Sequence, residues 1–213
     1  MIRRVSFFLA AVALLLSQTR DDLIVPGERI GPVTRTSTER SLLQTLGSSA
    51  VRAQIDIGEG MTEPGLIIYK DDPARRLEVV WSDQEPRHPV TIFICRDIVE
   101  ARCQWHTARG IGFGTTLKDL ERRNGKPFEL MGWGTDVSGN VTSYQGGKLE
   151  RELRPFGALA LTLVPRLDHG EYVPKLSQSE FDEVEGEKFI PSSNKVMQKL
   201  NPYVGAMTLE FPR

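Results

Sequence analysis

Residues 109–150 combine a glycine-rich turn, a short capped helix and strands joined by tight turns, and this order constrains the fold more than any other stretch. Thr116 stands before the apolar Leu117 and Leu120, with Asp119 three residues after it, as in a capping box. A helix of about nine residues is marginal on its own in water, because isolated helices below roughly 12 residues are barely stable. The helix must therefore pack on another element.

The strands that follow supply that element. Gly125 ends the helix, since glycine readily takes the left-handed conformation of a helix end, and Pro127 prevents its continuation. The pattern then predicts a strand over 128–133, a return strand over 141–145, and a further strand over 148–154 after a second glycine turn. This is the sequence signature of a helix followed by an antiparallel meander.

The same order occurs once more, 78 or 79 residues earlier. Gly31, Thr38, Leu42 and Gly47 match Gly110, Thr116, Leu120 and Gly125. Residues 51–57 then alternate apolar and polar side chains, which is the two-residue period of a strand with one buried face. Further strands are predicted at 66–70, 77–81 and 90–95.

The repeat predicts an α+β fold. Residues 27–95 and 109–165 each supply one short helix and about four antiparallel strands, and units this small cannot bury an apolar face alone. We expect the two repeats to share one continuous sheet with both helices on the same side. The opposite face of the sheet would then be the working surface.

Residues 166–213 form a C-terminal extension. The pattern predicts a strand at 158–164 before it, a polar loop over 168–187, a helix capped by Ser192 or Ser193, and a closing strand over 207–211. Because the closing strand has one polar face, we expect it to lie on a sheet that is solvated on one side.

Residues 1–19 resemble a secretory signal peptide. Two arginines precede an apolar run from Val5 to Leu16, which is too short to span a bilayer. The alternative is a retained amphipathic or membrane anchor, since no A-x-A cleavage pattern follows. The formal net charge of −1 falls to −3 without this segment, and such a surface argues against a nucleic-acid partner. We expect an exported protein, periplasmic or extracellular, with no membrane association after signal removal.

Cys95 and Cys103 are the two cysteines of the chain. In an oxidising compartment their even number and short spacing favour a disulfide over free thiols. A structural zinc site needs about four ligands, and only His106 is close in sequence. We therefore expect no metal and no cofactor.

The layout resembles a known family. A tandem repeat of this period, each unit a capped helix followed by a meander, resembles the beta-lactamase inhibitor protein and the related fold of the small lipoprotein of the outer-membrane assembly complex, over residues 27–165. The stretch GIGFGTTLKDLERRNGKPF is similar to a set of uncharacterised exported bacterial proteins. The single cysteine pair between the repeats and the long extension depart from the inhibitor pattern.

Polar motifs give weak signals of chemistry. Gly110, Gly112 and Gly114 precede a helix, as phosphate-binding loops do, but the spacing is not G-x-G-x-x-G and turn formation explains the glycines. Asp168-His169 and Glu171 are compatible with a metal or acid–base site, but one histidine in a polar loop is a weak signal and solvated loop charges explain these residues better. No serine lies in a G-x-S-x-G motif, so no catalytic residue is assigned.

The aromatic residues are the remaining candidates for a binding surface, because Trp and Tyr anchor many protein interfaces. All fall on or beside predicted strands: Trp133, Tyr144, Tyr69, Trp81 and Trp105. The alternative is that they fill the core, above all Trp81, which shares its face with Leu77 and Val79. Trp133, between two glycines, is the first choice for an exposed ring.

Two functions of different classes remain open. The first is an exported module that binds another envelope or secreted protein through a concave sheet face, as an inhibitor does. The second is a small envelope hydrolase whose active site is assembled from residues distant in sequence. An exposed aromatic face would favour binding, and a deep pocket with converging histidine or carboxylates would favour catalysis.

Overall fold

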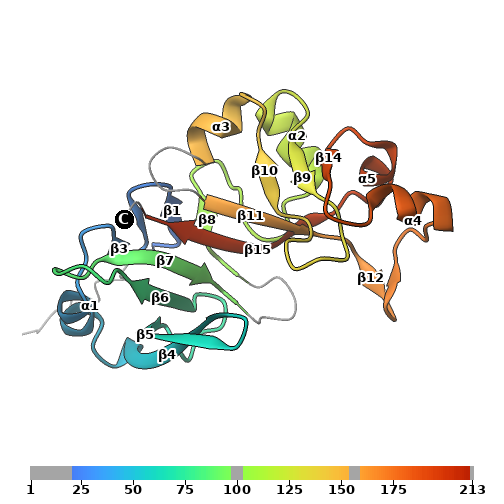
Figure 1. The fold of residues 1–213 in the computed structure, drawn as a ribbon. Coiled ribbons are helices and arrows are strands. Elements are labelled where there is room, and N and C mark those ends of the chain that lie inside the picture. The colour runs from blue at the N-terminus through green and yellow to red at the C-terminus, as the bar shows by residue number, and fades with distance from the viewer. Residues whose placement is uncertain (1–20, 97–102, 154–158, 212–213) are drawn as a thin grey trace, which may run out of the picture.

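The computed structural model describes residues 21–96, 103–153 and 159–211, which form an α+β fold (Figure 1). The expected signal peptide, residues 1–19, lies outside the described residues. Within the described part of the chain, no helix is long and apolar enough to cross a membrane.

A six-stranded antiparallel sheet forms the centre of the molecule (Figure 1). Its order is β11-β15-β7-β6-β5-β4, and its strands are β4 (Ala50–Gly58), β5 (Met61–Ile68), β6 (Leu77–Trp81), β7 (Pro89–Ile94), β11 (Leu159–Val164) and β15 (Tyr203–Glu210). The four strands predicted for the first repeat are present in sequence order. The closing strand is not at an edge, because β15 pairs with β11 on one side and β7 on the other.

Two strands of the second repeat lie in a different sheet. Its members are β9 (Glu129–Met131), β10 (Val141–Ser143) and β14 (Phe189–Pro191), in the order β10-β9-β14. The expectation of one continuous sheet is therefore wrong. β14 from the C-terminal extension occupies the second edge of β9, and Asn140, just before β10, forms a bridge to Thr162 of the larger sheet.

Residues predicted as the next strand form helix α3 (Lys148–Leu153) instead. Leu149 and Leu153 are four residues apart on one helical face, and both are buried. The backbone N–H of Leu149 donates to Oδ1 of Asn124, and Oε2 of Glu150 accepts from the N–H of Tyr144. These contacts, of which the one with Asn124 spans 25 residues, fix a helix where the local pattern indicates a strand.

The two capped helices form as predicted. α1 (Glu39–Leu46) begins after Thr38, whose side chain accepts from the N–H of Ser41. α2 (Leu117–Asn124) begins after Thr116, whose side chain accepts from the N–H of Asp119. Gly125 ends α2 with a φ of 81°, the left-handed conformation that glycine adopts without steric cost.

A small sheet at the N-terminal side covers part of the core. Its order is β3-β2-β1-β8, from β1 (Leu23–Val25), β2 (Arg29–Ile30), β3 (Val33–Thr34) and β8 (His106–Thr107). β1 and β8 pair in parallel, so the start of the described chain meets the segment after the disulfide. The buried side chains of Ile24, Ile30 and Val33 join the main core.

The C-terminal extension contains more structure than the expected polar loop. It holds a hairpin of β12 (Leu167–Asp168) and β13 (Glu171–Tyr172), then α4 (Gln178–Val184) and α5 (Lys195–Leu200). Asn194, rather than Ser192 or Ser193, caps α5. Ser192 is buried, and its hydroxyl donates to Oε2 of Glu121 at 2.6 Å.

The main core lies on one face of the six-stranded sheet and includes leucines of both predicted helices. Leu42, Leu117 and Leu120 are buried in this core, and Leu46 is half-buried against it. A smaller apolar cluster of Ile55, Val80 and Val90 lies apart from the main core. In β6 the side chain of Val80 alternates with those of Val79 and Trp81, which places this cluster on the opposite, open face.

Candidate functional site

The five aromatic side chains predicted as a binding surface belong to the core. Trp81, Trp105, Trp133 and Tyr144 are each 4% exposed or less, and Tyr69 is half-buried against the main core. Trp133, the first choice for an exposed ring, is therefore buried. The alternative that they fill the space between sheet and helices describes their positions.

Trp133 is covered by the C-terminal extension. Its backbone N–H donates to the carbonyl of Val184 at 2.9 Å, and its own carbonyl accepts from Gly186 at 2.7 Å. Its ring centroid lies 6.3 Å from that of Tyr172. Burial, and then the nearby Glu185 carboxylate, raises the pKa of Tyr172 above its ordinary value. Gly132 and Gly134, on either side of Trp133, let residues 184–186 approach closely, and they do not expose the ring.

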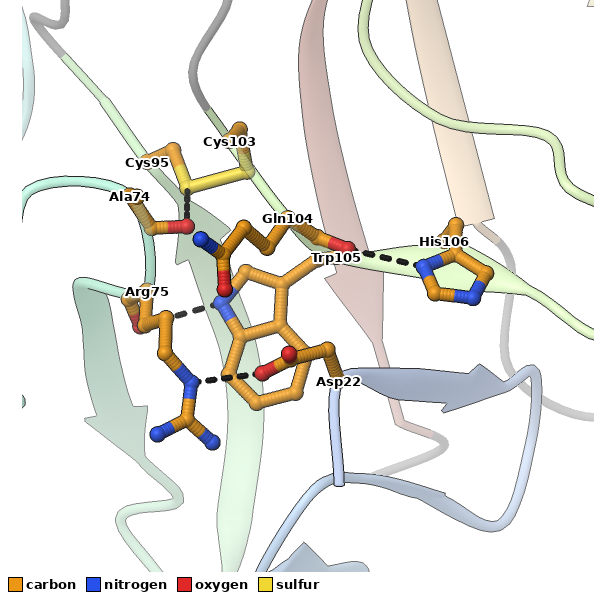
Figure 2. The surroundings of a disulfide bond; sticks show 8 residues. All are labelled: Asp22, Ala74, Arg75, Cys95, Cys103, Gln104, Trp105 and His106. Atoms are coloured by element: carbon orange, nitrogen blue, oxygen red, sulfur yellow. Dashed lines mark hydrogen bonds and ion pairs between the residues drawn. A yellow bond between two sulfur atoms is a disulfide. The ribbon is translucent and has the colours of Figure 1, made fainter. Parts of the chain in front are cut away.

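Trp105 is fixed on several sides (Figure 2). Its indole N–H donates to the carbonyl of Arg75 at 2.9 Å, and its ring centroid lies 6.4 Å from that of Tyr69. A Cβ at Gly31 would lie 2.6 Å from the indole ring, so only glycine fits against this face. Asp22 forms an ion pair of 2.5 Å with Arg75. Trp105 therefore joins the N-terminal sheet to the turn before β6.

Cys95 and Cys103 form the predicted disulfide beside Trp105 (Figure 2). Sγ of Cys95 lies 3.3 Å from the carbonyl oxygen of Ala74, and the N–H of Gln104 donates to the same carbonyl at 2.9 Å. The bond holds the segment that leads to Trp105 against the end of β7. Its role is structural, and neither cysteine is available as a nucleophile.

Tyr144 and Trp81 are buried at two other places. The Tyr144 ring centroid lies 6.0 Å from that of Phe128, under α3. Trp81 ends β6, and its indole nitrogen has no hydrogen-bond partner among the described residues. Of the five predicted aromatics, only Trp81 lines the hollow described below.

The glycine turn before α2 is filled by the chain itself. The N–H of Leu117 donates to the carbonyl of Pro202 and that of Lys118 to Oδ1 of Asn201. Gly114 donates to the carbonyl of Val204. Because a phosphate site requires free N–H groups at the start of a helix, these bonds favour turn formation over anion binding.

The Asp168-His169 and Glu171 group lies on the β12–β13 hairpin. The His169 side chain is 96% exposed, and its Nε2 lies 3.7 Å from Oδ1 of Asp168. Across residues 21–96, 103–153 and 159–211, no three His, Cys, Asp or Glu side chains gather closely enough to hold a metal ion. These residues are solvated loop groups.

The open face of the six-stranded sheet carries a hollow of ≈ 1070 Å³. Side chains of four strands form its floor: Val80 of β6, Thr91 and Phe93 of β7, Thr208 of β15, and Ala160 and Thr162 of β11. The turn between β6 and β7 forms one wall through residues 82–86 and His88. Asn140 and Val141, from the start of β10, form another part of the lining.

Acidic groups predominate in the lining of this hollow. Glu63, Asp83, Glu85 and Glu210 contribute carboxylates, and Arg35 is the arginine among the described lining residues. His88 also lines it, with Nδ1 placed 3.2 Å from the carbonyl oxygen of Ser37. Charged groups of one sign in a concave surface concentrate the field there. The hollow therefore favours a cationic occupant.

An ion cluster around the buried Glu78 lies beside the floor. Glu78, 5% exposed, accepts from Arg76 at 2.8 Å and from Arg96 at 2.5 Å. The Arg96 guanidinium lies 3.9 Å from the centroid of the Phe93 ring. Ion pairs and stacking together hold Phe93 in place at the floor, where a rigid aromatic contributes contact area at low entropic cost.

Apart from Trp81, the sequence analysis did not identify the residues that line the hollow. The alternation of Thr208 and Glu210 with buried neighbours in β15 indicated an open polar face, and Ala160 and Thr162 in β11 carry the same signal. The turn at residues 82–88 carried no such signal. Its place beside the sheet follows from the pairing of β6 with β7 and from the hydrogen bond between the N–H of Ser82 and the carbonyl of His88. No protein-family model, curated protein or solved structure matches this chain.

Proposed function

We propose that this chain is an exported binding module that holds a segment of another envelope or secreted protein in the hollow on the open face of its six-stranded sheet. The observation that carries the proposal is the hollow itself, whose floor is a rigid set of strands and whose lining mixes apolar and polar side chains. Surfaces of this kind suit a protein segment, because apolar contacts supply affinity and polar groups set the register.

The charge of the lining defines the class of partner. Four carboxylates against one arginine favour a segment that carries lysine or arginine beside apolar residues. Such a segment would place its apolar side chains on Phe93 and Val80 and its cations at the margin.

An exported location supports the same proposal. The Cys95–Cys103 disulfide is compatible with an oxidising, extracytoplasmic compartment, where such bonds persist. The charge pattern of residues 1–19 resembles that of a secretory signal. The envelope or the extracellular space is therefore where we place the partner.

A hydrolase has less support. Catalysis by an acid–base pair requires a base within hydrogen-bond reach of a hydroxyl or carboxylate. Among the described lining residues, Nδ1 of His88 lies 3.2 Å from the carbonyl oxygen of Ser37, which is a backbone group and neither a hydroxyl nor a carboxylate. We therefore propose binding as the function.

The test fills the hollow without disturbing the core. Ala160 is exposed on β11, so Ala160→Trp places a bulky ring in the hollow, and Thr208→Arg adds a positive charge that weakens the attraction for a cationic segment. We expect both variants to lose the partner that the wild type retains from an envelope extract. Quantitative mass spectrometry of cross-linked complexes measures the loss.

The matched control is Gln44→Trp, an exposed position on α1, away from the lining. It should retain the partner and melt like the wild type. If Ala160→Trp and Thr208→Arg capture the same proteins in the same amounts as the control, the hollow is not the binding surface.

A further inference from the structure

β4 is an edge strand of the six-stranded sheet, and its ladder with β5 is longer than the other ladders of that sheet. It pairs with β5 along residues 50–58, and no described element pairs with its other edge (Figure 1). An edge of this length presents a row of backbone donors and acceptors that another strand can use. The side chains on this strand therefore decide which strand it accepts.

The register shows which backbone groups face outward. The N–H of Tyr69 donates to the carbonyl of Ser49, so these two residues form a hydrogen-bonded pair, and such pairs recur at every second position of an antiparallel ladder. Residues 51, 53 and 55 thus bond to β5. Pro64 of β5 lies opposite Gln54. Proline has no backbone N–H, and at this position of the ladder none is needed for a hydrogen bond to β4. Residues 50, 52, 54 and 56 direct their backbone groups to the free edge.

We propose that a second copy of this chain pairs antiparallel with β4 through this edge, with Gln54 opposite Gln54 of the second copy. In this register Arg52 faces Asp56 of the second copy, and Asp56 faces Arg52 of the second copy. All three side chains are exposed in the single chain. Opposite charges placed directly across strands stabilise the pairing, and like charges oppose it.

The neighbouring registers lack this complementarity. Moving the centre by one residue toward Ala53 places Arg52 opposite Gln54, and moving it toward Ile55 places Arg52 opposite Gly58. Both keep the outward backbone groups aligned, but neither pairs opposite charges. The charges of β4 thus select one symmetric register.

The open face of β4 fits the same register. Val51 lies opposite Ile57 of the second copy, and Ala53 opposite Ile55 of the second copy, so apolar side chains meet apolar side chains. Val51, Ala53 and Ile57 are half-buried in the single chain and gain cover on pairing. Antiparallel pairing of this kind keeps the open faces of both sheets on the same side. The two hollows would then share one continuous sheet.

Charged residues on an edge strand also serve to prevent association, and this is the competing explanation. Arg52 already pairs with Glu39 of its own chain, while its side chain stays 72% exposed. A guanidinium has five N–H donors and can hold both carboxylates. The two explanations predict different results when charges are reversed. Charges that only prevent association need no opposite charge in a second copy, whereas the proposed pairing does.

Charge reversal distinguishes them. We expect the purified wild-type chain to reach twice the mass of one chain in sedimentation and light-scattering experiments as its concentration rises. Arg52→Asp and Asp56→Arg should each remain at the mass of one chain, because each puts like charges opposite one another. Mixing the two variants should restore the doubled mass, since every charged position then faces the opposite sign. The double variant Arg52→Asp, Asp56→Arg should restore it as well.

Two further variants complete the test. Arg40→Asp makes the same reversal at an exposed position of α1 and should associate like the wild type. Gln54→Pro removes an outward N–H and should abolish association, and circular-dichroism melts identify any variant that fails to fold. A wild type that keeps the mass of one chain at every concentration overturns the proposal. So does a mixture of well-folded single reversals that stays at that mass. The dimer does not depend on the proposed partner, and neither result bears on capture by the hollow.

Discussion

Trp133 is enclosed by residues of the C-terminal extension. Its ring lies beside Tyr172, which in turn lies 5.9 Å from the Phe181 ring of α4, centroid to centroid. The exposed fraction of Trp133 is 4%, whereas that of Leu120 in the main core is 0%. Both side chains are therefore core residues, although Trp133 was expected on the surface.

Replacing either residue by alanine should destabilise the protein strongly. We expect Leu120→Ala to lower the free energy of unfolding by about 2 to 5 kcal/mol and Trp133→Ala by about 3 to 5 kcal/mol, because each change leaves a cavity. Phe189, which is 65% exposed, is the control, and Phe189→Ala should change stability by about 0.5 kcal/mol or less. Urea denaturation measures all three. If Trp133→Ala changes the free energy of unfolding as little as Phe189→Ala does, the Trp133 ring is not part of the core.

α4 and α5 are joined by one ion pair. Glu180 lies in the capping box of α4, and its carboxylate accepts from Lys199 of α5 at 2.7 Å. The Lys199 hydrogen bond, followed by the hydrogen bond from the Ser177 backbone, lowers the pKa of Glu180 from 4.5 to about 2. At the scale of elements, this contact fixes the layer that covers Trp133.

The pH dependence of this contact has a definite sign. Because the folded pKa lies below the ordinary value, the ionised carboxylate favours the folded state at neutral pH, and this contribution is lost as the pH falls from 4.5 toward about 2. A carboxyl NMR titration should give the low pKa directly. Lys199→Gln should raise the pKa of Glu180 toward its ordinary value, and the nearby Lys195→Gln should leave it low. Equal pKa values in both variants would exclude Lys199 as the cause.

The whole molecule is joined by its last strand. β15 pairs with β7, from the segment predicted as the first repeat, and with β11, from the segment predicted as the second. Its residues Val204, Met207 and Leu209 are buried in the main core. The sheet therefore cannot be completed until the end of the chain is in place. This arrangement predicts one cooperative unfolding transition for the two repeats.

Removing β15 should abolish that transition. A chain that ends after Asn201 loses two rows of ladder bonds and exposes the edges of β7 and β11, so we expect no cooperative thermal melt by circular dichroism. Ala206 is exposed on β15, and Ala206→Ser should melt like the wild type, which shows that the strand and not its open-face side chains carries the effect. If the truncated chain melts like the wild type, the remaining strands form a stable core without β15, and the prediction is wrong.

The sequence by itself determined the features that depend on neighbours a few residues apart. The caps of α1 and α2, the Gly125 helix end, the alternation in β4 to β7 and the Cys95–Cys103 pair are present as expected. Each rests on local chemistry: a hydroxyl within reach of an N–H, a residue without Cβ, or two thiols on a short loop. The α+β class follows from these features.

Tertiary structure alone decided which surfaces are covered. A strand edge or an apolar face is compatible with many partners, and the choice among them depends on residues far along the chain. β14 takes the edge of β9, α3 forms because Asn124 and Tyr144 bond to it, and the extension encloses Trp133. The alternation in β15 and β11 predicts an open face, but the hollow exists only because the turn at residues 82–88 and the start of β10 border that face.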